Sequence, residues 1–378
     1  MMGRGVAEAT VVMAVLISSA IVMNGAKAQN ARPATPIASK TAGEAFKNVK
    51  VLKDIPADSL IPAMQFITAS LGKECEFCHV HDAFEKDDKK PKQRARAMME
   101  MMFAINKDNF HGHREVTCYT CHRGAADPVG TPLVMTAEMK PQLAEAEENT
   151  EEKENSGPPA DQLFEKYLKA IGGVSAVEEI DSRAMKGTIS FGDRNVPIDI
   201  YAKAPDKRIS ITHTPDGDSI TAFDGHEGWL GAPKRPAREM HGSDIDGASM
   251  DADLHFAVHL KDMFTKTEIV GTEKIGDNEA VHVVGQRESR TPLQLYFDEK
   301  SGLLLRLVRF AETPLGELPT QIDYADYREA GGVKIPYRWT LARPGGRFTI
   351  QVSEVKENVP VDDSKFEKPA QEQKPAAK

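Results

Sequence analysis

The stretches VTCYTCHRG at residues 116–124 and ECEFCHV at residues 74–80 contain every cysteine of the chain. In each stretch two cysteines stand three positions apart, and a histidine follows the second one directly. The units are Cys75, Cys78 and His79, and Cys118, Cys121 and His122. A C-x-x-C-H unit is typical of covalent haem attachment, in which both thiols bond to the porphyrin and the histidine binds its iron. The repeat therefore predicts two covalently attached haem c groups.

Other uses of four cysteines fit this spacing less well. A zinc site built from two C-x-x-C pairs usually has about 15–20 residues between the pairs, whereas 39 residues separate Cys78 from Cys118. A thioredoxin-like redox pair would follow a strand, but helical patterns precede both motifs. Two disulfides are a further alternative, and they would leave the two following histidines unexplained.

The beginning of the chain has the pattern of a secretory signal peptide. Arg4 provides the basic start, residues 11–23 are mostly apolar, and Ala26-Lys27-Ala28 is a small-residue cleavage site. We expect residues 1–28 to be removed after Ala28, with an uncleaved anchor as the alternative. Export predicts a periplasmic protein, in a compartment where thiols tend to oxidise.

Composition and charge indicate an ordinary globular chain with room for two domains. Its 378 residues are 40% apolar and 28% charged, and the net charge of −9 predicts no nucleic-acid partner. An acidic stretch that ends in NSGPP is typical of a solvated linker. The expected segments are a flexible leader (29–44), a dihaem domain (45–136), an acidic linker (137–160), a second domain (161–368) and a disordered tail (369–378).

A helix is predicted before each motif, and both helices carry methionines. The first has apolar residues at Leu60, Met64, Ile67 and Leu71, between a cap at Asp58 and a stop at Gly72. The second runs from Lys92 to about Lys107, with a stripe of Ala95, Met98, Met102 and Ile105. A methionine opposite the histidine would give a site suited to electron transfer, whereas an open iron would favour oxygen or peroxide chemistry. Met64 is the candidate at the first iron. At the second, Met98, Met99, Met101 and Met102 all qualify by residue type.

Residues 48–128 resemble the cytochrome c subunit of photosynthetic reaction centres. The resemblance is carried by NVKVLKDIP (48–56), GKECEFCHV (72–80), RARAMMEMMFAIN (94–106) and VTCYTCHRG (116–124). In that family the helix before each motif donates an axial methionine, which implies Met64 and Met98 here. Ala97 replaces the second arginine of the family's R-R-M-x-x-M pattern. The resemblance covers about half of a four-haem subunit. His111 and His113 occupy a loop that in the family ligates a distant haem, so they are either surface residues or contacts to a partner's haem.

The second domain changes to the period of two that is typical of strands. A helix is predicted over 161–172, a turn over 298–302 and a helix over 251–264. Strands are predicted over 185–191, 196–201, 208–212, 280–285, 293–298, 303–310 and 348–355. AFDGHEGW (222–229), YFDEKSGLLLR (296–306) and DYREAGGVKIPY (326–337) resemble the outer-membrane lipoprotein carrier-like half-barrel. The predicted fold is therefore α+β with two domains: a small α-helical dihaem c-type cytochrome and an antiparallel β half-barrel with one or two helices.

These patterns predict a periplasmic electron-transfer protein rather than an enzyme. Cys75, Cys78, Cys118 and Cys121 would attach the haems, with His79 and Met64 on one iron and His122 and Met98 on the other. Its partners would be periplasmic or membrane-bound electron donors and acceptors, a photosynthetic reaction centre among them. Arg94, Arg96 and Arg123 are candidate partners of the haem propionates. One alternative is a peroxidase-like dihaem enzyme or sensor with one open iron. The other is a lipid or hydrophobic-ligand binding module with an ancillary cytochrome.

Overall fold

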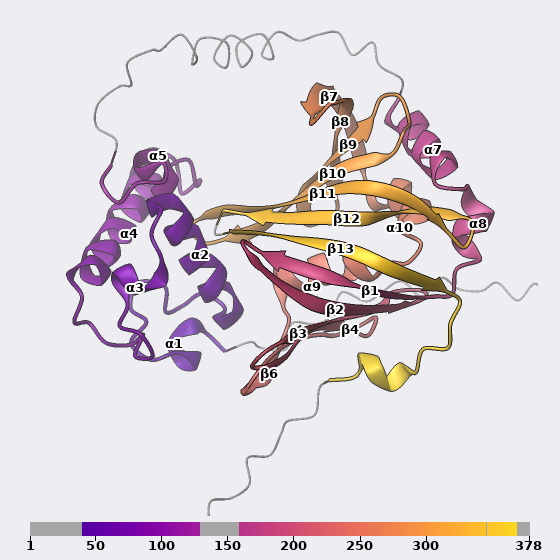
Figure 1. Ribbon diagram of the computed structural model, residues 1–378. Helices are drawn as coiled ribbons and strands as arrows, with labels where there is room; N and C mark the ends of the chain where they lie inside the picture. Colours follow the sequence, from indigo (N-terminus) through magenta and orange to yellow (C-terminus); the bar gives the residue numbers. More distant parts are fainter. Residues whose placement is uncertain (1–39, 129–158, 345, 369–378) are drawn as a thin grey trace, which may run out of the picture. The chain divides into compact units, whose positions relative to one another are not determined.

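The computed structural model describes residues 40–128, 159–344 and 346–368 (Figure 1). The expected signal peptide, most of the flexible leader, nearly all of the acidic linker and the tail lie outside these residues. Within the described ranges, no helix is both long and apolar enough to span a membrane.

Residues 40–128 are helical. The helices are α1 (Ala42–Ala45), η1 (Ala57–Ser59), α2 (Leu60–Leu71), α3 (Cys75–Cys78), α4 (Lys90–Asn109) and α5 (Cys118–His122). The two predicted helices correspond to η1 with α2 and to α4. Helix α2 ends at Gly72, which adopts the left-handed conformation with φ 59° that glycine takes without steric cost.

The buried face of α4 differs from the predicted one. Met99 and Met102 are buried, whereas Met98 is 39% exposed and Met101 is 50% exposed. Two polar residues, Lys92 and Asn106, share the buried face because their polar atoms find partners inside the protein. The predicted stripe was right at Met102 and wrong at Met98, because apolar spacing alone cannot recognise a buried face that includes satisfied polar side chains.

Residues 159–368 form one antiparallel sheet of 13 strands with short helices around it. The first strands are β1 (Ser182–Phe191), β2 (Arg194–Lys203), β3 (Lys207–Thr214), β4 (Gly217–Phe223), β5 (Gly228–Ala232) and β6 (Arg235–Glu239). The others are β7 (Lys266–Ile275), β8 (Asn278–Arg287), β9 (Arg290–Asp298), β10 (Leu304–Thr313), β11 (Gly316–Ala330), β12 (Val333–Arg343) and β13 (Gly346–Glu357).

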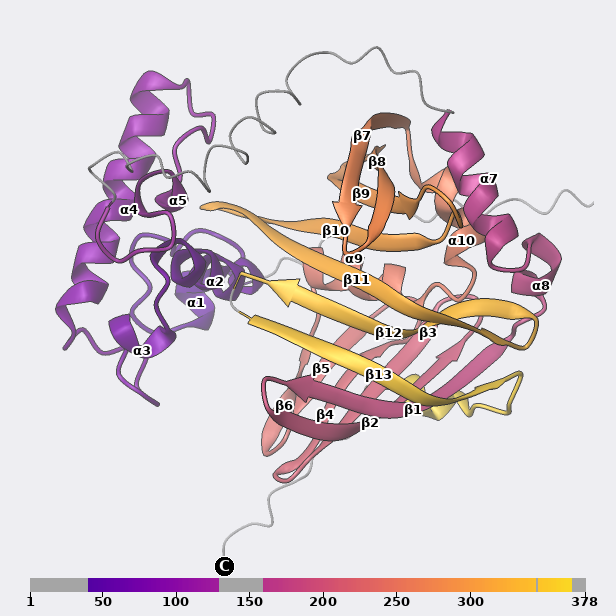
Figure 2. The same cartoon turned by 45° about the horizontal axis from the view of Figure 1, so that its top comes forward.

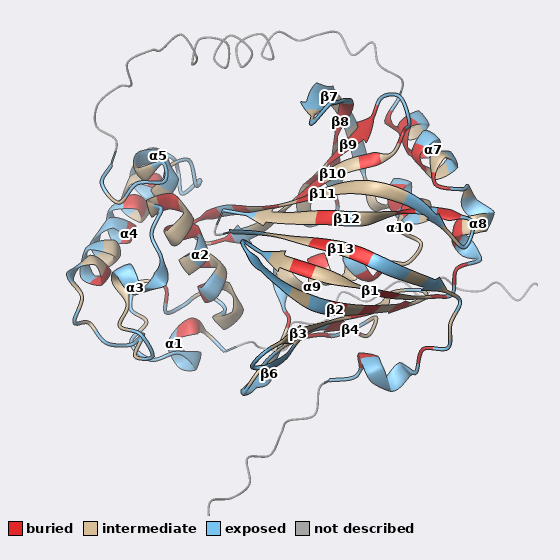
Figure 3. Ribbon diagram, viewed as in Figure 1, coloured by how far each residue is buried: buried red, intermediate tan, exposed pale blue. Residues whose placement is uncertain are grey.

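Each strand pairs with its neighbours in the sequence except where β1 meets β13, and β6 and β7 are the two edges. The pairing of Ile189 with Ile350 shows the register at this junction. The edge strand β7 is exposed along most of its length (Figure 3). The predicted α+β class with helices first and an open antiparallel sheet second is therefore confirmed.

Six of the seven predicted strands fall within observed ones, the strand predicted over 303–310 begins one residue before β10, and residues 298–302 form the turn between β9 and β10. The patterns did not predict β4–β7, β11 and β12. Strands β5 and β6 have only five residues each and include glycine or proline, which weakens a strand pattern. Strand β7 lacks a buried side with a period of two, so its sequence carries little alternation.

Six helical segments accompany the sheet. They are α7 (Ala160–Ala170), α8 (Val174–Glu178), α9 (Gly242–Ala252), α10 (Phe256–His259), η2 (Leu260–Met263) and η3 (Asp363–Phe366). Helices α9 and α10 lie against one face of the curved sheet (Figure 2). The apolar side chains of α7, including Phe164 and Tyr167, join the main core with Phe297 of β9. The prediction over 251–264 found α10 and η2 but missed α9, whose sequence GSDIDGASMDA is poor in strong helix formers.

Candidate functional site

Each C-x-x-C pair lies on a single short helical turn. Cys75 and Cys78 begin and end α3, and Cys118 and Cys121 lie within α5. Residues three apart on a helix face the same side, so each pair presents two thiols together. All four thiols are free in this structure. Burial raises the pKa of the Cys78 and Cys118 thiols, so these two sulfurs stay protonated at neutral pH.

The two motif histidines are oriented in the same way. The His79 Nδ1 atom lies 2.9 Å from the Phe84 carbonyl oxygen, and the His122 Nδ1 atom lies 3.0 Å from the Ala125 carbonyl oxygen. A carbonyl can only accept, so Nδ1 carries the proton in both rings. The Nε2 lone pair is then free in both, which is the arrangement of a histidine that binds a metal.

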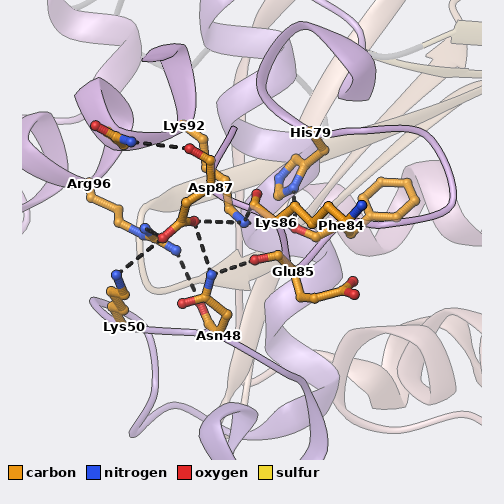
Figure 4. Close-up of polar contacts among 10 residues, drawn as sticks. Asn48, Lys50, His79, Phe84, Glu85, Lys86, Asp87, Lys92 and Arg96 are labelled. Carbon is orange, nitrogen blue, oxygen red and sulfur yellow. Dashed lines mark hydrogen bonds and ion pairs between the residues drawn. The ribbon is translucent and has the colours of Figure 1, made fainter. Parts of the chain in front are cut away.

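A network of charges fixes the loop that holds His79 (Figure 4). The Lys92 Nζ atom donates to the Phe84 carbonyl at 2.8 Å and to the Lys86 carbonyl at 2.7 Å. It also lies 3.1 Å from a carboxylate oxygen of Asp87, the residue at the centre of the network. The Arg96 guanidinium donates to the same carboxylate at 2.9 Å and to the Asn48 carbonyl at 3.0 Å.

Asp87 remains a carboxylate because three cations surround it. The Arg96 guanidinium, followed by the ammonium groups of Lys92 and Lys50, holds the pKa of the Asp87 carboxyl well below its usual range. The Asn48 side chain also donates to Asp87 and to the Glu85 carbonyl. Arg96 is therefore engaged in this network, although its sequence position had suggested a propionate partner.

The second motif is held by backbone contacts. The Asn106 side chain donates to the Val116 carbonyl at 2.7 Å and accepts from its N–H at 2.9 Å, which fixes the chain two residues before Cys118. After the motif, the Gly124 N–H donates to the Ser70 carbonyl of α2 at 2.9 Å. A Cβ atom added at Gly72 would lie 2.1 Å from the Gly124 carbonyl oxygen, so glycine is required there.

The candidate methionines fall into two groups. Met99 and Met102 pack in an apolar cluster with Phe66, whereas Met98 and Met101 are exposed on α4. Met64 is half-buried at the border of the same cluster. Of the four candidate methionines on α4, Met98 and Met101 are therefore the two whose side chains are exposed.

The helical segment also exposes many large apolar side chains. Eight of the eleven such side chains among the described residues lie in 40–128: Phe46, Ile61, Phe77, Phe84, Met98, Met101, Phe110 and Tyr119. Phe77 and Tyr119 lie inside the two motifs, and the Phe84 ring centroid is 5.3 Å from that of His79. Phe77, Phe84 and Tyr119 thus place exposed apolar side chains within or beside the two motifs. Free paired thiols, oriented imidazoles and apolar surroundings together fit a covalently attached haem.

The sheet has a separate feature, a cavity of about 550 Å³. Its apolar lining includes Met185, Ile198, Leu307, Ile322, Trp339 and Ile350. Arg309 also lines it and donates to both carboxylate oxygens of Asp251 on α9, at 2.9 and 3.1 Å. Burial raises the pKa of the Tyr324 phenol in the same lining, so this group stays neutral.

Sequence reasoning missed the partners of His79. Lys92 served only to mark the start of a predicted helix, and Phe84 and Asp87 were not singled out. The available signal was the charged stretch FEKDDKK at 84–90, between the first motif and α4. The lining arginines of the sheet were also missed, because a charged residue inside a strand pattern ordinarily indicates the solvent side.

Known proteins that are similar to this chain in sequence include cytochromes, as the two C-x-x-C-H motifs predict. A family model described as "Photosynthetic reaction centre cytochrome C subunit" matches residues 3–195. The photosynthetic reaction center cytochrome c subunit of Thermochromatium tepidum is 36% identical over 101 residues, which are 25% of this chain and 25% of that protein. The subunit of Rubrivivax gelatinosus is 34% identical over 116 residues, 29% of this chain and 31% of that protein. The alignments thus span between a quarter and a third of these relatives.

Two solved structures are similar to this chain in part. A DUF1329 family protein from Desulfovibrio piger is 14% identical with a TM-score of 0.40, and the match covers 56% of this chain and 98% of that one. A LolA superfamily protein from Nitrosomonas europaea is also 14% identical, with a TM-score of 0.38, and the match covers 56% of this chain and 99% of that one.

Proposed function

Because the chain belongs to the photosynthetic reaction centre cytochrome c subunit family, we propose that it is a periplasmic dihaem cytochrome that relays single electrons. Membership of the family implies covalently bound haem c and a role in electron transfer. The number of haems, their ligands and the two domains at 45–136 and 161–368 are parts of the proposal.

The observation that carries the proposal is the matched geometry of the two motif histidines. Each Nδ1–H donates to a carbonyl a few residues further along, which leaves Nε2 of His79 and of His122 to bind iron. The thiols of Cys75 and Cys78, and of Cys118 and Cys121, would each add across a vinyl group to form a thioether. This addition moves the thiol hydrogen to the vinyl carbon and needs no oxidant.

Met64 and Met98 are the proposed ligands on the opposite side of each iron. Met98 is exposed, which supports it as the ligand of the second iron over Met99 and Met102, because these two are buried in the apolar cluster. Haem iron with histidine and methionine ligands supplies one-electron redox chemistry at a raised potential. With both sulfurs in place, no position would be left for oxygen or peroxide, so the protein would pass electrons without catalysing a reaction on a substrate.

Carbon monoxide binding distinguishes a relay from the peroxidase-like alternative. The reduced full-length protein should not bind carbon monoxide, because both irons would hold six ligands. Met64→Ala should allow binding at one iron, and Met101→Ala should not. Binding to the unmodified protein at either iron would contradict the relay and favour an enzyme or sensor.

Export and partners also belong to the proposal. The signal-peptide pattern of residues 1–28 supports delivery to the periplasm, with periplasmic or membrane-bound electron donors and acceptors as partners. A photosynthetic reaction centre would be one such acceptor in a host that has one. Co-purification of the intact protein from host membranes, followed by mass spectrometry, identifies the partner. Recovery of no redox protein would count against a relay.

The cavity supports a second function for the sheet, binding of a hydrophobic ligand such as an acyl chain. A volume of about 550 Å³ is in the range of known ligand pockets, and the lining is mostly apolar. Extraction of the purified protein with organic solvent should release a lipid. A fluorescent fatty acid should also bind, and Leu341→Arg in the lining should weaken its binding. Val270→Arg on the exposed strand β7 is the control. Equal binding by both variants would refute the proposal.

A further inference from the structure

One carbonyl oxygen serves both the first motif histidine and a buried lysine. The Phe84 oxygen accepts from the His79 ring at 2.9 Å and from the Lys92 ammonium at 2.8 Å (Figure 4). His79 comes from the end of α3, and Lys92 comes from the first turns of α4. The hydrogen bond that orients the histidine is therefore shared with a positive charge.

The structure holds this ammonium group in place. Lys92 is 8% exposed, and lysine is buried to this degree almost only when it is paired. Its three donors reach the carbonyls of Phe84 and Lys86 and the carboxylate of Asp87. Asp87 is fixed in turn by Arg96. Lys92 is thus a charged group of fixed position, and it is not a surface side chain that happens to reach the loop.

Within the part of the chain that the structure describes, no cation shares the carbonyl that orients the second motif histidine. The His122 ring donates to the Ala125 carbonyl at 3.0 Å, and among the described residues no other side chain donates to that oxygen. The two histidines therefore have equivalent hydrogen bonds, and only one acceptor is shared with a lysine. This difference gives an internal comparison within one chain.

From this asymmetry we infer that Lys92 is a positioning residue that raises the reduction potential at the His79 site above that at the His122 site. The inference rests on the proposed haem attachment at both motifs. Two physical effects act in the same direction. The ammonium draws electron density from the Phe84 oxygen, which makes this oxygen a weaker acceptor for the His79 N–H. The imidazole ring then carries less negative charge and donates less electron density to the iron. Its positive charge also favours the reduced iron, which carries one positive charge fewer.

The pair of sites is then ordered. An electron that enters at either site is more stable at His79 than at His122, so the His79 site holds the last electron to be lost on oxidation. Hydrogen bonding around the ligand and local charge are among the means by which proteins set the potentials of haem sites.

The test is a potentiometric titration of the full-length holoprotein, followed by visible absorption. Wild type should give two one-electron waves, and the higher one should be the wave that Met64→Ala displaces. Lys92→Met should lower the midpoint potential of that wave. The equilibrium constant for distribution of one electron between the two sites should then change at least threefold. At 59 mV per tenfold for one electron, this is a shift of about 28 mV. The other wave should move by less than a third of this.

Lys50→Met is the matched control. Lys50 also pairs with Asp87, at 3.2 Å, and its loss removes the same charge, but its side chain is 59% exposed and makes no bond to the Phe84 carbonyl. This variant should leave both waves in place. Lys92→Gln, which keeps a polar side chain in the buried site, should reproduce the shift of Lys92→Met if the latter protein accumulates poorly.

Three results with the lysine variants would overturn the inference. They are an unchanged titration in the Lys92 variants, an equal shift of both waves, and an equal shift in Lys50→Met. A fourth contradicting result needs no lysine variant: Met64→Ala displaces the lower of the two waves seen in wild type. A protein without two covalent haems would instead give no pair of waves, and the proposed function itself would then fail.

Discussion

Replacing Gly72 by alanine should destabilise the helical segment well beyond the usual cost of such a change. Gly72 has φ 59°, and a Cβ atom there would lie 2.1 Å from the Gly124 carbonyl oxygen. The left-handed conformation alone costs an alanine roughly 1–2 kcal/mol. The clash must also move the Gly124 segment, which breaks its 2.9 Å hydrogen bond to the Ser70 carbonyl, worth about 1 kcal/mol. We therefore expect Gly72→Ala to cost about 2–3 kcal/mol in total.

Gly112→Ala is the matched control for this prediction. Gly112 also has a positive φ, 83°, but an added Cβ atom would meet nothing within 4 Å. This variant should cost only the conformational part, roughly 1–2 kcal/mol. Urea unfolding of both variants, followed by the helical circular dichroism signal, gives the difference. Equal destabilisation by the two changes would refute the reasoning, because it would mean that the contact between Gly72 and Gly124 does not constrain the fold.

Three further predictions follow from the described contacts. Met98→Ala should open the second iron to carbon monoxide with little loss of stability. Met99→Ala should leave carbon monoxide excluded but cost about 2–5 kcal/mol through a core cavity, and the reverse pattern would show that the ligand is misassigned. Asn106→Ala should cost about 2–4 kcal/mol in urea unfolding, since it leaves the N–H and the carbonyl of half-buried Val116 without partners, and a loss below about 1 kcal/mol would contradict this. The hydrogen bond that the His213 ring donates to the Asp218 carboxylate raises the pKa of His213, so this pair should stabilise the fold below about pH 6.5, and the gain should be lost as pH rises through the folded pKa. Thermal unfolding of wild type and of His213→Gln at pH values below and above 6.5 checks this prediction. The same pH dependence of the unfolding temperature in both proteins would contradict it.

The parts of the fold that the sequence predicted are those specified by local pattern. The spacing of apolar residues located α2 and α4, and the DEKSG stretch located the turn at 298–302. The seven predicted strands carry alternating or continuous apolar residues, which is the signal that burial of a strand leaves in a sequence. Helix α9 was missed because its stability comes from contacts such as Arg309 with Asp251, which are distant in the sequence.

The candidate site shows the same limit. The C-x-x-C-H units could be recognised because attachment chemistry requires fixed residue types at fixed spacing. The face that α4 buries could not be predicted from the sequence, because Lys92 and Asn106 lie on it. Their side chains are buried through hydrogen bonds, which a pattern of apolar residues does not reveal. The bond shared at the Phe84 carbonyl joins a loop, a motif and a helix, and only the folded chain brings these three together.

The central claim is that both C-x-x-C-H units hold covalent haem, and the intact mass of the mature protein tests it most directly. Mass spectrometry under denaturing conditions should give the chain mass plus two haem groups. Changing both Cys118 and Cys121 to alanine should remove one group while the other stays attached. A wild-type mass equal to that of the bare polypeptide, or to the polypeptide with a single haem, would contradict the account.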